Sequence, residues 1–395
     1  MPTDSQKAPA TAPNQRRRVI DFVTVATFLG LLGLPLVTLW LGNGAEISGP
    51  EKRLLARPPQ LEAQWASWAS FPRRSEAYFG DHLGYRETMI RNFARIHIAI
   101  FGLSPSDKLI VGREGWFFYG DPDAVANYRG TDPLRPGELA RWQRTLEERR
   151  DWLADQGIAY LVILVPDKHE VYGEYMPPSL PRATELNPLD QLADYLGKKS
   201  SVEVLDLRLP LQAAKAEGRI YHRTDTHWNE AGAHAAYRAI LQRLGALLPT
   251  KLNPKPAPVE RGRHQSPGLG LAGLVGLENV LGEEVLSARL SRPRARIARE
   301  HRARYDQRTR NLEPVAHGIP DPQLPRAVVF RDSFGNALIP FLSEHFQRIL
   351  YVWDRDVDPQ VVKTEKPDIV IQQIVGRFLR RRPRGIAELE TAEQN

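Results

Sequence analysis

Short, mostly apolar segments recur along the chain after residue 159, and they constrain its fold more than any other feature. The clearest, residues 160–165 (YLVILV), has the length of a strand and no charged side chain. A continuous apolar run of this length is typical of a strand buried on both faces. We therefore predict an α/β domain with a mostly parallel sheet between two layers of helices. The predicted strands are residues 160–165, 202–206, 327–330, 349–353 and 368–375.

Helical patterns separate these apolar segments. The clearest covers residues 136–156, where Leu139, Trp142, Leu146 and Leu153 form one apolar stripe. Their spacing of three to seven residues places them on one face of a helix. Further helices are predicted at residues 188–198, 229–244 and 337–346, and another at residues 76–101, ahead of the first strand.

The composition is that of a folded chain. Of 395 residues, 42% are hydrophobic and 26% are charged, enough apolar material for one large domain or two small ones. The absence of cysteine excludes a thiol nucleophile, a disulfide framework and cysteine-containing metal sites. The formal net charge of +7 suits an anionic partner such as acidic polysaccharide, nucleic acid or lipid headgroups, and equally suits a solvated basic surface.

An uncharged, mostly apolar segment covers residues 22–41, directly after the arginines at positions 16–18. About 20 helical residues cross the roughly 30 Å hydrocarbon core of a bilayer. The positive-inside rule then places the N-terminus in the cytoplasm and the chain after Gly42 outside. We predict a transmembrane helix here; the alternative is a cleaved signal peptide with its cleavage site near Gly44 and Ala45.

The chain is expected to have four parts. A cytoplasmic tail (1–18) precedes the transmembrane anchor (19–42), a proline-containing stalk (43–75) and one α/β domain (76–395). Inside that domain, residues 287–311 are dense in arginine. This segment is either a substrate-facing basic patch or a solvated insertion.

Ser333 follows the apolar segment 327–330 and precedes Gly335 and a predicted helix. A serine at such a turn projects its hydroxyl from the carboxyl edge of the sheet, where ligands bind in open α/β folds. Its own backbone N–H is then a candidate donor to an oxyanion. The alternative is a simple helix cap formed by Asp332 or Ser333.

Asp225 and His227 lie two residues apart, so on extended backbone their side chains would point to the same side. The carboxylate can then fix one tautomer of the imidazole, whose other nitrogen accepts a proton from a hydroxyl. The alternatives are a buried histidine paired with a carboxylate, and a metal site formed with His222 and His234. We place His234 on the helix surface and expect no metal, because no HExxH or similar motif occurs among the 10 histidines.

Together with these residues, four segments resemble the alginate O-acetyltransferase group of SGNH-hydrolase-like proteins, the AlgJ/AlgX family. They occur in the family order, and the likeness extends over residues 51–379. The segments are residues 104–119 (SPSDKLIVGREGWFFY), 165–172 (VPDKHEVY), 224–232 (TDTHWNEAG) and 331–336 (RDSFGN).

The resemblance implies an SGNH-hydrolase-like three-layer sandwich in the periplasm, attached to the inner membrane by the N-terminal helix. It implies acetyl transfer through Ser333 as nucleophile, His227 as general base and acid, and Asp225 as its orienting residue, without a cofactor. The Asp-x-His pair precedes the serine, which resembles the permuted order of this group. Lys168, Asn336 and Arg331 are the further candidates for substrate or oxyanion contacts.

The partners implied are an exported, alginate-like polysaccharide and a membrane-bound O-acyltransferase that supplies acetyl groups, with no nucleic acid. The chain looks closer to the membrane-anchored AlgJ type than to the longer AlgX type. A relay of acetyl groups is therefore an alternative to direct modification of the polymer. Two other functions stay open, namely a carbohydrate acetylesterase with the same triad and a non-catalytic, polymer-binding subunit of a secretion complex.

Overall fold

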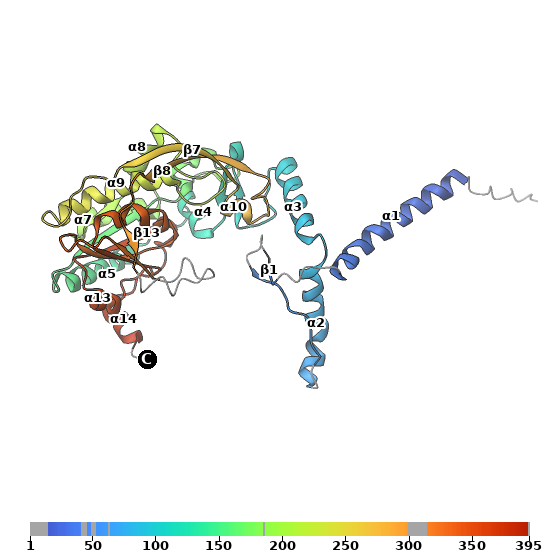
Figure 1. The fold of residues 1–395 in the computed structure, drawn as a ribbon, viewed down its shortest axis with the longest axis horizontal. Coiled ribbons are helices and arrows are strands. Elements are labelled where there is room, and N and C mark those ends of the chain that lie inside the picture. The colour runs from blue at the N-terminus through green and yellow to red at the C-terminus, as the bar shows by residue number, and fades with distance from the viewer. Residues whose placement is uncertain are drawn as a thin grey trace, which may run out of the picture. The chain divides into compact units, whose positions relative to one another are not determined.

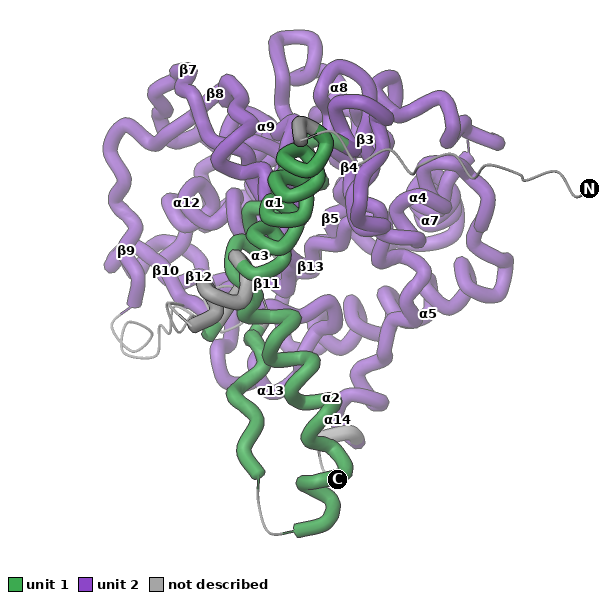
Figure 2. The backbone as a smooth tube through the Cα atoms, turned by 90° about the vertical axis from the view of Figure 1, so that its right-hand side faces the viewer, with its two compact units in different colours: residues 1–96 green, residues 97–395 purple. Residues whose placement is uncertain are grey.

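The computed structural model describes residues 15–40, 46–48, 53–61, 64–184, 186–298 and 314–393. It separates into two compact units, residues 1–96 and 97–395, coloured green and purple in Figure 2. The division falls inside the segment 76–101, which the sequence predicts as one helix.

The first unit is mainly helical. Tyr85 interrupts the helix predicted at residues 76–101, because its φ of +62° lies in the left-handed region that an α-helix excludes. Its elements are α1 (Gln15–Trp40), a two-stranded antiparallel sheet of β1 (Ile47–Ser48) and β2 (Arg53–Leu54), α2 (Trp65–His82) and α3 (Arg86–Ile96).

The structure does not support the predicted transmembrane helix. Residues 22–40 of the predicted segment are helical, within α1. In the described part of the chain, however, no helix combines the length and the apolar character that crossing a bilayer requires. Gly44 and Ala45, the alternative cleavage site, lie outside the described residues.

The second unit is built around a seven-stranded mixed sheet (Figure 1). The five predicted strands are present and pair in parallel, and two unpredicted strands, β10 and β9, add antiparallel pairs at one edge. In sheet order the strands are β6 (Val204–Asp206), β5 (Ala159–Val165), β13 (Ile369–Val375), β11 (Arg326–Phe330), β12 (Arg348–Val352), β10 (Val315–Gly318) and β9 (Arg296–Ile297).

Helices cover both faces of this sheet. Along β5, Leu161 and Ile163 pack into one apolar cluster, and Val162 and Leu164 into another, as the two-residue period of a strand requires. The first cluster includes α8 (Arg208–Glu217), α9 (Glu230–Leu247) and α12 (Ile339–Leu342). The second includes α5 (Pro136–Ala154), α7 (Pro188–Lys199), α13 (Pro359–Glu365) and α14 (Ile386–Glu393). The fold is therefore a three-layer α/β/α sandwich.

Two hairpins lie outside the main sheet. β3 (Leu109–Val111) pairs with β4 (Phe117–Tyr119). β7 (Val259–Pro267) pairs along its whole length with β8 (Gly282–Leu290), and Figure 1 shows this hairpin beside α8 and α9. The arginine-dense segment 287–311 thus begins in β8 and includes β9, while residues 299–313 lie outside the described part of the chain.

Shorter helices complete the second unit. Of the helix predicted at residues 337–346, residues 337–345 are helical, in the consecutive segments η4, α12 and η5. The short helices are η1 (His97–Phe101), η2 (Arg113–Gly115), α4 (Pro122–Arg129), α6 (Lys168–Val171), η3 (Gly173–Tyr175), α10 (Gly270–Gly273), η4 (Ser333–Leu338), η5 (Ser343–His345) and η6 (Gly376–Phe378).

A buried arginine connects α5 to the sheet and to the C-terminal segment. Arg149 has no exposed surface, and it donates hydrogen bonds to Gln372 Oε1 at 2.9 Å and to Asp356 Oδ1 and Arg384 O, each at 2.6 Å. Burial raises the pKa of Asp356, but the charge of Arg149 and the bonds from Arg384 outweigh it and leave the pKa below its ordinary value.

We expect Arg149→Met to lower the free energy of unfolding by about 3 kcal/mol, because it leaves buried acceptors without their donor. Urea denaturation measures this change. The control is Arg144→Met on the same helix, where the side chain is exposed and the change should stay within about 0.5 kcal/mol. Because the folded pKa of Asp356 is lowered, the difference should shrink as the pH falls below 3.8, where the unfolded carboxylate protonates. Equal losses in the two variants would contradict this assignment.

Candidate active site

Ser333 is the first residue of η4, three residues after the end of β11. Asp332 caps this short helix, accepting from Phe334 N at 2.9 Å through Oδ1 and from Val375 N at 3.1 Å through Oδ2. A Cβ atom at Gly335 would lie 2.8 Å from the side chain of Arg331, so the turn requires glycine there. The cap and the serine at the strand end, which the sequence offers as alternatives, are thus both present, on adjacent residues, and Ser333 is partly exposed.

Asp225 and His227 lie in a tight loop, not on the extended backbone that their spacing suggested. The loop is closed by a bridge between Tyr221 and Trp228 and by a hydrogen bond from His222 N to His227 O at 3.1 Å. Between these residues the backbone bends. The two side chains meet because Asp225 Oδ1 accepts from His227 N at 3.0 Å, a local turn that aspartate commonly forms.

The structure brings Asp225, His227 and Ser333 into one hydrogen-bonded chain. Asp225 Oδ1 lies 2.6 Å from His227 Nδ1, and His227 Nε2 lies 2.8 Å from Ser333 Oγ. Burial alone would raise the pKa of Asp225, but its hydrogen bond to His227 and the charge of that ring hold the pKa well below the ordinary value. Asp225 therefore stays ionised, and an ionised carboxylate fixes the imidazole tautomer whose free nitrogen faces the hydroxyl.

Gly270 completes the binding of the Asp225 carboxylate. Its N–H donates to Asp225 Oδ2 at 2.8 Å, and a Cβ atom at this position would lie 2.4 Å from the same oxygen. Only glycine can therefore approach this closely. The predictions from the sequence did not include Gly270, whose only signal there is the glycine-rich stretch 268–273.

Glu283 on β8 is a second residue that the predictions from the sequence did not include. Its buried carboxylate accepts from Arg223 N at 2.7 Å, Thr224 N at 3.0 Å and Thr224 Oγ1 at 2.6 Å, and it pairs with Arg219 at 3.2 Å. Burial raises the pKa of Glu283, but the bonds from Thr224 and Arg223 outweigh it and lower the pKa. The carboxylate thus satisfies the N–H groups at the start of the loop.

Lys168 and Arg331, two of the candidates for substrate or oxyanion contacts, are both buried. Lys168 is 1% exposed and donates to three backbone carbonyls, so it has no N–H left for a ligand. Arg331 is 2% exposed, and its guanidinium lies 4.7 Å from the ring of Trp353. Burial also lowers the pKa of Arg331 to about 10. Asn336 is partly exposed in η4, three residues after Ser333.

His234 is buried on α9, and the prediction that it lies on the helix surface is wrong. Its ring packs against Tyr237 and Phe341, with centroids 5.7 and 5.5 Å apart. Burial, aided by the charges of Arg261 and Arg238, lowers the pKa of His234 to about 4. Over the described residues, no three His, Asp or Glu side chains cluster closely enough to hold a metal ion.

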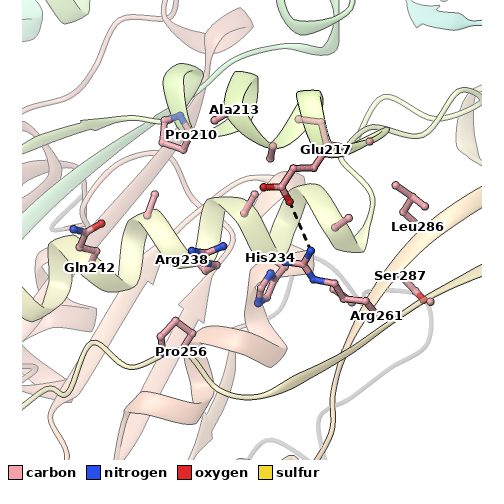
Figure 3. Close-up of a pocket in the computed structure, with 18 of the residues that line it drawn as sticks. Pro210, Ala213, Glu217, His234, Arg238, Gln242, Pro256, Arg261, Leu286 and Ser287 are labelled. Carbon is pink, nitrogen blue, oxygen red and sulfur yellow. Dashed lines mark ion pairs between the residues drawn. The ribbon is translucent and has the colours of Figure 1, made fainter.

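His234 borders a pocket of about 890 Å³ between α8, α9 and the β7–β8 hairpin, drawn in Figure 3. The pocket does not include Ser333, His227 or Asp225. Two of its arginines are paired, Arg261 with Glu217 at 3.7 Å, as the dashed line in Figure 3 marks, and Arg263 with Glu284 at 3.2 Å. Much of its positive charge is thus compensated within the protein.

The three-layer sandwich and the Ser–His–Asp arrangement define a hydrolase-like α/β protein. The chain belongs to the family described as the SGNH hydrolase-like domain of acetyltransferase AlgX, whose model matches residues 109–313. This match includes Asp225 and His227 and ends before Ser333.

Curated relatives carry the name probable alginate O-acetylase AlgJ. The protein from Pseudomonas syringae pv. tomato is 27% identical over 235 residues, which are 59% of this chain and 54% of the relative. The one from Pseudomonas fluorescens is 31% identical over 150 residues, 37% of this chain and 36% of the relative. The chain thus spans about half the length of the curated relatives it matches, or less.

Solved structures align with this chain at low sequence identity. PatB1 of Bacillus cereus, solved with a sulfonyl adduct, aligns with a TM-score of 0.50 and 16% identity over 69% of this chain and 94% of that protein. The O-acetyltransferase domain of Pseudomonas putida AlgJ aligns with a TM-score of 0.47 and 20% identity over 72% of this chain and 99% of that domain.

We expect Gly270→Ala to slow the reaction of Ser333 by about 10²-fold, because the added methyl group displaces the Asp225 carboxylate that orients His227. The rate of covalent modification of Ser333 by a sulfonyl fluoride measures the change. Gly273→Ala in the same helix is the matched control, since the nearest atom to its Cβ would be 4.0 Å away. A normal rate in Gly270→Ala would show that this contact has no role in orienting the pair.

Proposed function

We propose that this chain is a serine-dependent O-acetyltransferase that takes part in the acetylation of an exported, alginate-like polysaccharide. The observation that supports it most is the chain of hydrogen bonds from Asp225 through His227 to Ser333, at 2.6 and 2.8 Å. Membership of an acetyltransferase family supports the reaction type. The name of the curated relatives, probable alginate O-acetylase, supports the substrate class.

The first half-reaction forms acetyl-Ser333. His227 Nε2 removes the proton from Ser333 Oγ, which attacks the carbonyl carbon of an acetyl donor. The Ser333 N–H, which has no hydrogen-bond partner among the described residues, donates to the developing oxyanion. When the tetrahedral intermediate collapses, the protonated His227 returns the proton to the leaving group, and the Asp225 carboxylate stabilises the imidazolium in between.

The second half-reaction repeats these steps with a sugar hydroxyl. His227 removes the hydroxyl proton, the sugar oxygen attacks the acetyl carbon, and Ser333 Oγ leaves and takes up the proton. Water in place of the sugar would give the esterase reaction with the same residues. The family resemblance supports a membrane-bound O-acyltransferase as the protein that supplies the acetyl donor.

Incubation with an activated acetyl ester should add one acetyl group to Ser333, detected by mass spectrometry of the peptide that contains it. Ser333→Ala should remove this adduct and lower turnover by at least about 10³-fold, because the nucleophile is lost. Ser179→Ala, which removes an exposed hydroxyl elsewhere, should leave both unchanged. Full turnover in Ser333→Ala would rule out the acetyl-serine route and favour a non-catalytic role.

A second experiment separates transfer from hydrolysis. The same donor is supplied with and without an alginate oligosaccharide, and both acetylated sugar and free acetate are quantified. We expect acetylated sugar to accumulate at the expense of acetate, because the sugar hydroxyl competes with water for one acyl-enzyme. Free acetate without acetylated sugar would contradict the transferase proposal and identify an esterase.

A further inference from the structure

Lys168 is a buried lysine that takes no part in the proposed chemistry. It begins α6, immediately after Pro166 and Asp167 at the carboxyl end of β5. Its Nζ atom donates to Phe117 O at 2.5 Å, Arg223 O at 2.9 Å and Asp225 O at 2.8 Å. An ammonium group has three N–H donors, so each one has an acceptor.

These acceptors come from chain segments that are far apart in the sequence. Phe117 belongs to β4, and Arg223 and Asp225 belong to the loop that carries the histidine. The same loop is joined to β4 by a hydrogen bond from Phe117 N to Arg223 O at 2.9 Å. Lys168 therefore fastens two segments to the end of a central strand at one point.

Burying the Lys168 ammonium costs free energy, because the charge loses its contact with water. Its side chain is 1% exposed, and no carboxylate forms an ion pair with it within the described residues. The faces of Trp116 and Phe118 lie 5.0 and 5.1 Å from Nζ and stabilise the cation in part. An apolar side chain of similar size would avoid the cost of desolvating an ammonium group. The role of Lys168 therefore lies in the three hydrogen bonds that its ammonium donates.

The contact to Asp225 O connects Lys168 to the reacting groups. The carbonyl of Asp225 is held by Lys168, while its carboxylate is held by Gly270 N and His227. Because the main-chain oxygen and both carboxylate oxygens of Asp225 are hydrogen-bonded, the orientation of the carboxylate is restricted. That direction determines where the His227 ring points.

We propose that Lys168 is a positioning residue for acyl transfer, and that it holds the Asp225 backbone so that the Asp225 carboxylate turns His227 towards Ser333. The inference rests on the proposed function, because it assigns Lys168 a role in that reaction. Lys168 does not contact the substrate. It acts through Asp225, and in this it differs from an oxyanion donor or a general base, which contact the reacting atoms directly.

Lys168→Met tests the proposal in the whole protein. Loss of the ammonium should lower kcat for an acetyl ester by about 10²-fold and leave KM within about twofold, because misaligned catalytic groups slow the chemical step. Nuclear magnetic resonance gives a second readout, since the downfield signal of the proton between His227 Nδ1 and Asp225 should shift or broaden. Lys198→Met, which removes an exposed lysine, is the control for both readouts.

Chemical rescue distinguishes positioning from general stabilisation. The chain has no cysteine, so Lys168→Cys provides a single thiol that can be alkylated in denaturant before refolding. Bromoethylamine restores an ammonium at the lysine position, and iodoacetamide gives a neutral amide of similar length. We expect the aminoethyl form to recover most of the sulfonyl fluoride reactivity of Ser333, and the amide form to remain slow, at equal helical content by circular dichroism.

Equal reactivity of the two refolded forms, or a normal kcat and an unshifted proton signal in Lys168→Met, would overturn the positioning role. Failure of the proposed function looks different. In that case the unmodified protein itself would show neither acetyl-ester turnover nor sulfonylation at Ser333, whatever residue stands at position 168.

Discussion

The site depends on how completely the polar atoms of Asp225 are bound. One carboxylate oxygen accepts from His227, the other from Gly270 N, and the main-chain oxygen accepts from Lys168. Each of these bonds removes a rotation that would let the carboxylate turn away from the imidazole. The entropy cost of aligning these groups is therefore met when the protein folds, before any substrate binds, which lowers the barrier of a reaction that needs them aligned.

The loop that carries Asp225 and His227 is held by two buried charges of opposite sign. Glu283 can only accept hydrogen bonds, and it binds the N–H groups of Arg223 and Thr224. Lys168 can only donate, and it binds the carbonyls of Arg223 and Asp225. A bent loop has no neighbouring strand to satisfy its backbone, and buried backbone groups without partners are costly. The two charged side chains supply the partners that a strand would otherwise provide.

The sequence predicts those parts of this arrangement that follow from continuous apolar segments and short spacings. The five parallel strands have such segments, and Ser333 follows one of them at the edge where parallel strands end. The strands β10 and β9 (VAHG and RI) and most of β7 (VERGRHQSP) have no apolar period, so pairing with a neighbour determines them. The sequence shows that Lys168 follows a strand. It does not show which groups the Lys168 side chain binds, because neither Phe117 nor Asp225 is near Lys168 in the chain.

Ser333 and Lys168 are connected by contacts at the carboxyl ends of three adjacent strands, β11, β13 and β5. Asp332 caps the helix of Ser333 and accepts from Val375 N, at the end of β13. Two residues later, Arg377 N donates to Asp167 at 2.8 Å, and the Arg377 side chain forms a buried ion pair with the same carboxylate. Asp167 directly precedes Lys168 and caps its helix. The parallel register of β11, β13 and β5 thus determines the separation between the serine and the lysine that holds Asp225. A shift of one residue in that register would change this separation, so the sheet and the bound loop together set the geometry in which His227 meets Ser333.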